Sequence, residues 1–201
     1  MKTKRNDRKH VMREISRKLL HLIVGTTGTV LAYFGVITGI HILLFTGLFT
    51  IIALFHKRYE FRPIEKILSK LDRKDIIPGF GAIMLGLGIG LAYIIFPRDI
   101  AFIAGICVSL VDGVSTIIAT LQEKKTGKRN SFATLVGSIA AFAVLSSTLT
   151  HIPISVIIIG VLVAAGIDSW YSRIWIIDDN LLMPILVGTI SFVALIIVNL
   201  L

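Results

Sequence analysis

The sequence predicts an all-α membrane protein, one domain over residues 1–201 with about seven transmembrane helices. Composition is the first reason: 55% of the 201 residues are hydrophobic, 16% are charged, and the mean hydropathy is +0.86. Soluble domains are about 45–50% apolar and about 25% charged. The second reason is a series of apolar stretches near the roughly 20 residues that one bilayer span requires. The third is the charge of the connections between them.

The apolar stretches are expected to be helices, because a segment in hydrocarbon must satisfy its own backbone hydrogen bonds. They cover about 19–35, 37–55, 77–96, 100–121, 132–149, 154–172 and 181–201. The first stretch follows a basic arm and could instead be the core of a signal peptide. Residues 32–35 form a poor cleavage site, however, so the first stretch is interpreted as a span.

Positive charge fixes the predicted orientation. Of the 21 lysines and arginines, all but Arg98 lie in the N-terminal arm or in the second-to-third, fourth-to-fifth and sixth-to-seventh connections. The positive-inside rule therefore predicts a cytoplasmic N-terminus and an external C-terminus. The net charge of +9 then reflects membrane orientation, and no nucleic-acid partner is expected.

Two basic segments are expected to be helical outside the bilayer core. Residues 1–18 form a cytoplasmic N-terminal helix. Residues 56–75 have Ile64, Ile67 and Leu68 at the spacing of one helical face. This second segment is interpreted as an amphipathic helix on the cytoplasmic surface, where it would contact anionic membrane lipids.

Acidic residues inside or next to the spans are the main candidates for function. Asp112 lies within the fourth stretch, Asp168 near the end of the sixth, and Asp178 and Asp179 just before the seventh. Charges at such depth are costly and usually face a protein interior or a wet cavity. The structural alternative for Asp112 is an interhelical hydrogen bond or a pair with Lys or Arg. For Asp178 and Asp179 it is helix capping.

These carboxylates, together with Asn180, are expected on the cytoplasmic half. Oxygen ligands suit Mg²⁺ or Mn²⁺. A nearby loop combines cations and polar groups that suit a polyphosphate; its candidates are Lys124, Lys125, Lys128, Arg129 and Asn130. The fifth stretch begins close to Gly137 and Ser138, so its first amides could meet an anion. Acids for metal and bases for phosphate on one face indicate a nucleotide–metal site.

A further cluster lies where the first helix enters the membrane. Glu14, Arg17, Lys18 and His21 are three or four residues apart and share one side of a helix. The alternative is a set of basic side chains that reach toward water, with an interfacial histidine.

Three separated motifs resemble the CTP-dependent polyprenol kinases, which include dolichol and phytol kinases, within a wider group of membrane cytidylyltransferases. The motifs are E-x-x-R-K-x-x-H at 14–21, D-G at 112–113 with its following basic loop and G-S at 137–138, and D-D-N-L-x-x-P at 178–184. Their order and spacing cover most of the chain. One departure is that Ala133 and Val136 stand where family members often have lysine and glutamate.

The resemblance implies transfer of the γ-phosphoryl group of CTP to a long-chain isoprenoid alcohol in the bilayer. It assigns catalysis to Asp112, His21, Glu14 and Asp179. Metal binding falls to Asp112, Asp178, Asp179 and Asp168, with Mg²⁺ or Mn²⁺ as cofactor. Nucleotide contacts are assigned to Lys124, Lys125, Lys128, Arg129, Asn130, Gly137, Ser138, Asn180, Arg17 and Lys18. Glu14, Arg17, Lys18 and His21 would also frame the alcohol end, with His21 or an aspartate accepting its proton.

Three other functions remain open at this point. A cytidylyltransferase that forms a CDP-lipid would use the same nucleotide chemistry. A small ion-coupled transporter would use Asp112 and Asp168 for its ion, although no paired half-helix pattern is visible. A lipid-binding scaffold without catalysis would account for the departure at Ala133 and Val136. The sequence does not indicate an oligomeric state.

Overall fold

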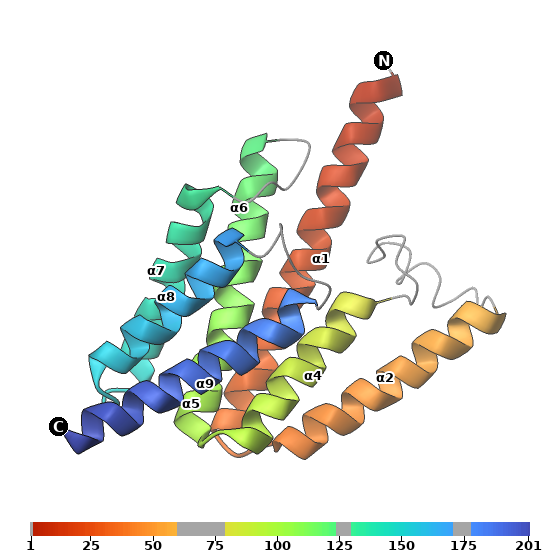
Figure 1. Cartoon of the computed structure of the whole chain (residues 1–201). Helices are drawn as coiled ribbons and strands as arrows, with labels where there is room; N and C mark the ends of the chain where they lie inside the picture. The colour runs from red at the N-terminus through yellow and green to blue at the C-terminus, as the bar shows by residue number, and fades with distance from the viewer. Residues whose placement is uncertain (1, 60–78, 124–129, 171–177) are drawn as a thin grey trace.

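The computed structural model is all-α and describes residues 2–59, 79–123, 130–170 and 178–201. Its helices, in chain order, are α1 (Lys2–Tyr33), α2 (Gly39–Tyr59), α4 (Phe80–Ile95), α5 (Arg98–Cys107), the π-helix η1 (Val108–Asp112), α6 (Gly113–Glu123), α7 (Ser131–Thr148), α8 (Ile154–Trp170) and α9 (Asp179–Leu200). Because α5, η1 and α6 are continuous, the described part of the chain forms seven rods (Figure 1).

The all-α prediction is confirmed. Six rods match one predicted apolar stretch each within a few residues, and α1 contains the first stretch but begins well before it. The predicted N-terminal helix 1–18 is the first half of α1, from Lys2 onward. The predicted amphipathic segment 56–75 begins in the last turn of α2 and otherwise lies outside the described residues.

In the described part of the chain, three helices are long and apolar enough to cross a membrane. They are Arg98–Gln122, Ser131–Thr148 and Asp179–Leu200. Shorter apolar helices cover Gly39–Phe55, Phe80–Ile95 and Ile154–Trp170. With 16 and 17 residues, α4 and α8 are about 24–26 Å long, close to the roughly 30 Å of a bilayer core.

The continuous rod α5–η1–α6 is the centre of the fold. In its most apolar stretch 89% of the residues are buried, against 28% in α7 and 33% in α9. A helix that is apolar on all sides has to be covered on all sides. The side chains of Phe102, Ile103 and Ile106 are fully buried here, between α1, α4, α7, α8 and α9.

Successive rods run in alternating directions (Figure 1). The ends of α2, α6 and α8 and the starts of α4, α7 and α9 point toward the end of the molecule that carries the N-terminus, here called the N-terminal end. The C-terminus lies at the opposite end. Residues from the three motifs, far apart in sequence, therefore come toward one end of the bundle.

Candidate functional site

Asp112 occupies the centre of the site, at the last position of η1. Asp112 is 1% exposed to solvent. One turn of π-helix interrupts the α-helical rod at this position, and such insertions often occur at functional sites. Gly113 follows immediately and lies against Leu22 of α1, so that α1 comes close to the Asp112 turn.

The first motif meets Asp112 directly. Lys18 of α1 forms a buried ion pair with its Oδ2 atom, and Nε2 of His21 lies 3.5 Å from the same oxygen. On the other side, the hydroxyl of Thr116 lies 3.5 Å from Oδ1. The pair with a lysine was the structural alternative for Asp112, and the structure contains it. Lys18, which was expected to contact the nucleotide and to frame the alcohol end, here balances the charge of Asp112.

The ring of His21 is held in one orientation. It forms a hydrogen bond with the backbone of Val108, in the first turn of η1. Nε2 is buried and has no hydrogen-bond partner among the described residues. The bond to Val108 is therefore made by Nδ1, as donor to the carbonyl, which leaves Nε2 of a neutral ring as an acceptor.

Glu14 and Arg17 form the outer half of the same cluster. Their side chains share an ion pair of 2.9 Å, and both are largely buried. Arg17 also faces α4 and α9: a Cβ atom on Gly81 would lie 3.7 Å from its guanidinium and 3.6 Å from the amide nitrogen of Asn180. Gly81 thus lies next to residues of both the first and the third motif.

The third motif forms the start of α9. Asp178 is the N-cap residue and accepts hydrogen bonds from the backbone and side chain of Asn180, at 3.0 and 2.7 Å. Asp178 therefore caps the helix, which was the structural alternative to a functional role for this residue. Burial, and then the charge of Asp179, raise the pKa of the Asp178 carboxyl, while Asn180 and Lys18 act against this rise. Lys18 is therefore within electrostatic range of both Asp112 and Asp178.

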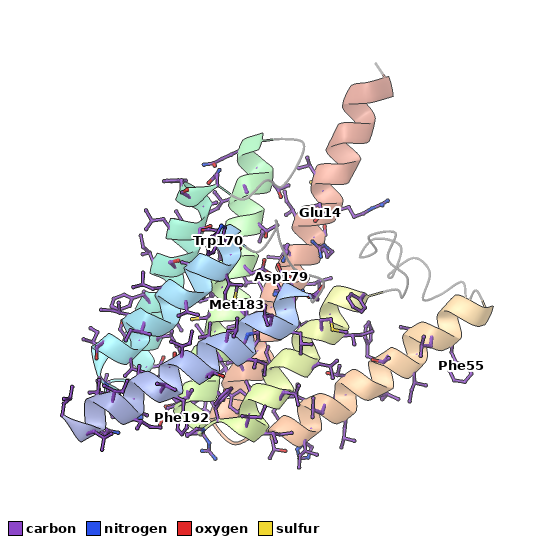
Figure 2. All side chains as sticks on the ribbon, in the orientation of Figure 1. Glu14, Phe55, Trp170, Asp179, Met183 and Phe192 are labelled. Atoms are coloured by element: carbon purple, nitrogen blue, oxygen red, sulfur yellow. The ribbon has the colours of Figure 1, made fainter. Side chains whose placement is uncertain are left out.

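Close helix contact fixes the position of Asn180. A Cβ atom on Gly88 of α4 would lie 2.4 Å from the Asn180 carbonyl oxygen, so only glycine permits this approach of α4 to α9. Asp179 is the first residue of α9 and is partly buried. Figure 2 shows Glu14 and Asp179 in the half of the molecule that carries the N-terminus, whereas Phe192 of the same α9 helix lies in the other half.

Asp168 lies in a second buried polar contact, between α7 and α8. Its Oδ2 accepts a hydrogen bond of 2.6 Å from the hydroxyl of Thr134. Gly137, three residues further along α7, packs on η1: its Cβ atom would lie 2.8 Å from the carbonyl oxygen of Val111. Ser138 donates to the carbonyl of Thr134 within its own helix.

Of the five candidate residues in the basic loop, Asn130 lies within the described part of the chain. Asn130 caps α7, accepting a hydrogen bond from the Ala133 amide at 2.7 Å, and it also donates to Gln122 at the end of α6. The predicted phosphate ligands Lys124, Lys125, Lys128 and Arg129 lie outside the described residues.

The carboxylates suit a metal that is shared with a ligand. Among residues of the ranges that the structure describes, no three His, Cys, Asp or Glu side chains gather closely enough to hold a metal ion. Mg²⁺ commonly binds through one or two carboxylates and completes its coordination with substrate phosphates and water. Of the described carboxylates, Asp112 and Asp179 are the candidates for that mode.

An apolar cavity of about 460 Å³ opens beside Arg17 and His21, between α1, α2 and α4. The side chains of Leu20, Phe49 and Leu85 line it. The polar cluster around Asp112 therefore borders a space suited to hydrocarbon.

Three buried polar atoms in this region have no hydrogen-bond partner among the described residues: Nε of Arg17, Nε2 of His21 and Oδ1 of Asn180. Leaving such an atom unsatisfied costs about 1–3 kcal/mol, and buried polar groups in folded proteins are nearly always paired. Arg17 and His21 line the cavity, so their two atoms are candidates to bind a polar group of a ligand.

Sequence reasoning missed three parts of this site. Thr116 lies one helical turn beyond Asp112, at a spacing that could have suggested the contact. Gly81 was not connected with the site, and Thr134 was not connected with Asp168. The last two depend on contacts between distant helices, for which one sequence gives no signal.

No protein-family model, curated protein or solved structure matches the chain.

Proposed function

We propose that the protein is a membrane kinase that transfers the γ-phosphoryl group of CTP to the hydroxyl of a long-chain isoprenoid alcohol. The observation that carries the proposal is the buried cluster of Lys18, His21 and Asp112, in which His21 also lines an apolar cavity. The chain thus places a buried charged cluster next to a cavity with a mainly apolar lining. A lipid alcohol that reacts with a charged nucleotide requires both.

The proposal includes the full membrane arrangement. The seven rods cross the bilayer, with the N-terminus and the site on the cytoplasmic side, as the distribution of lysine and arginine predicts. The nucleotide then arrives from the cytosol, and the alcohol places its hydroxyl at the inner interface. This arrangement brings the two substrates to the same end of the bundle.

In the proposed reaction, the alcohol oxygen attacks the γ-phosphorus and forms a new P–O bond. The bond from the γ-phosphorus to the β,γ-bridging oxygen breaks, and CDP leaves with those electrons. The hydroxyl proton passes to Nε2 of His21, which the bond to Val108 holds as an acceptor. Positioning and charge neutralisation dominate phosphoryl transfer, so few groups need to react covalently.

The surrounding residues position and neutralise. Lys18 compensates the charge of Asp112 and extends its positive field to Asp178. Arg17, oriented by Glu14, and the side-chain oxygen of Asn180 are candidates for phosphate or ribose contacts. A magnesium ion bound with the triphosphate would neutralise its charge, with Asp112 and Asp179 as the candidate carboxylates.

Phosphate labelling tests the proposal. The purified protein in mixed micelles with Mg²⁺, CTP and an isoprenoid alcohol is expected to transfer label from γ-labelled CTP to lipid and none from α-labelled CTP. Lipid labelled from the α-position would instead identify a cytidylyltransferase once a lipid phosphate is supplied. Absence of lipid label from either position, with ATP also inactive, would overturn the proposal.

A further inference from the structure

The α1–α2–α4 cavity is built for an amphiphile with one small polar end. Most of its lining is apolar or glycine, including Val24, Ile42 and Ile89. Its charged lining residue, Arg17, and its imidazole, His21, both come from the first motif on α1. A volume of about 460 Å³ lies within the roughly 300–1,000 Å³ of small-molecule sites.

The polar end offers an unused buried atom. His21 has a side chain that is 8% exposed, and its Nε2 has no hydrogen-bond partner in the described part of the chain. A hydroxyl group placed there would satisfy this atom, while a hydrocarbon tail behind it would cover the apolar lining.

The cavity is also bordered by side chains that face the bilayer. Val24 of α1 is 61% exposed and Phe45 of α2 is 65% exposed, and both line the cavity. In the proposed membrane arrangement these residues meet lipid, so a bilayer-dissolved molecule can enter sideways between α1 and α2. α2 packs mainly on α4, which closes the far side of the cavity.

From these features we propose that the α1–α2–α4 cavity holds the tail of the isoprenoid alcohol, and that Gly28 sets the space available to that tail about two turns below the hydroxyl. This inference rests on the proposed function for the identity of the alcohol. Gly28 lies seven residues beyond His21 on α1, or about 10 Å along a helix. It lines the cavity, and a Cβ atom added there would meet no atom within 4 Å.

Gly28 is therefore a position where a side chain occupies cavity space without displacing the protein. Gly28→Leu tests the inference, and Gly47→Leu is a matched control. Gly47 is also a helical glycine with open space around its Cβ position, but it lies on the exposed side of α2 and is not a lining residue. Both changes have the same effect on helix propensity.

The readout is binding of alcohols of two lengths, measured by competition against a photoreactive isoprenoid alcohol in micelles. A one-unit alcohol ends before Gly28, and a polyprenol of about ten units passes it. Gly28→Leu is expected to weaken binding of the polyprenol by about tenfold, an effect typical of overpacking a site. Binding of the short alcohol should be unchanged. Gly47→Leu should leave both unchanged. Equal affinities in the Gly28→Leu variant and the wild type would overturn the inference.

A second measurement uses the wild-type protein, so it does not depend on the folding of a variant. A polyprenol with a diazirine three units from its hydroxyl is expected to label lining residues such as Phe45 or Leu85. Labelling confined to the outer surface of α9, for example Val193, would overturn the inference. Labelling of the cavity residues by a photoreactive phospholipid, if excess polyprenol did not reduce it, would also overturn the inference.

The two proposals fail differently. If the protein transfers phosphate and Gly28→Leu does not alter the dependence of transfer on chain length, the tail site is refuted and the proposed kinase activity stands. Cavity labelling by the polyprenol without phosphate transfer from any nucleotide would refute the kinase and keep a lipid-alcohol site.

Discussion

Removal of the Lys18 ammonium tests whether Asp112 depends on it. In Lys18→Met the 1% exposed carboxylate loses its ion-pair partner while the side chain keeps a similar length. Breaking a buried pair by removing one partner costs about 3–5 kcal/mol. The hydroxyl of Thr116, 3.5 Å from Oδ1 of Asp112, offers partial compensation. We therefore expect a loss near the lower limit, about 3 kcal/mol.

The assay is the free energy of unfolding in mixed micelles, measured by titration with a denaturing detergent. Two controls define the result. Arg13→Met removes an exposed cation from the same helix and should change stability by less than about 0.5 kcal/mol. Lys18→Met combined with Asp112→Leu removes both charges and should recover most of the loss, because apolar replacement of a buried pair is often neutral. A Lys18→Met protein as stable as Arg13→Met would refute the reasoning.

Three further substitutions have definite expectations. Asp112→Asn keeps the shape of the side chain and its contact with Thr116, so we expect a folded protein in gel filtration with transfer of labelled phosphate reduced about 100-fold or more; near-normal transfer would contradict the role of Asp112. Gly137→Val places a Cβ atom 2.8 Å from the carbonyl oxygen of Val111, so unfolding should become easier by about 1–3 kcal/mol, and unchanged stability would show that α7 does not pack on η1. Arg98→Gln, at the end of the bundle opposite the site, should leave transfer and stability unchanged within about 0.5 kcal/mol; a large loss of transfer would contradict the orientation.

The sequence was sufficient to locate the helices, because hydrophobic length and the alternation of basic connections are local properties. It also grouped the first motif with Asp112 as members of one site, although 94 residues separate Lys18 from Asp112. That grouping came from the resemblance, whereas the contact itself comes from the packing of α1 on η1 and α6.

Individual roles were harder to predict than the grouping. Lys18 was expected to contact the nucleotide and to frame the alcohol end, and the structure pairs it with Asp112, because a buried carboxylate requires a charged partner. Asp178 caps α9, as its position before a helix allows. The π-turn at Asp112 and the α1–α2–α4 cavity arise from the relative placement of three or more helices, which hydrophobic periodicity does not encode.

The most direct measurement is an experimental structure of the protein with Mg²⁺ and a non-hydrolysable CTP analogue in which the β,γ-bridging oxygen is replaced. We expect density for the triphosphate at the N-terminal end of the bundle, with its γ-phosphate facing His21 and Asp112. Triphosphate density at the opposite end near Arg98, or a saturating analogue that leaves the Lys18–Asp112 region empty, would contradict it.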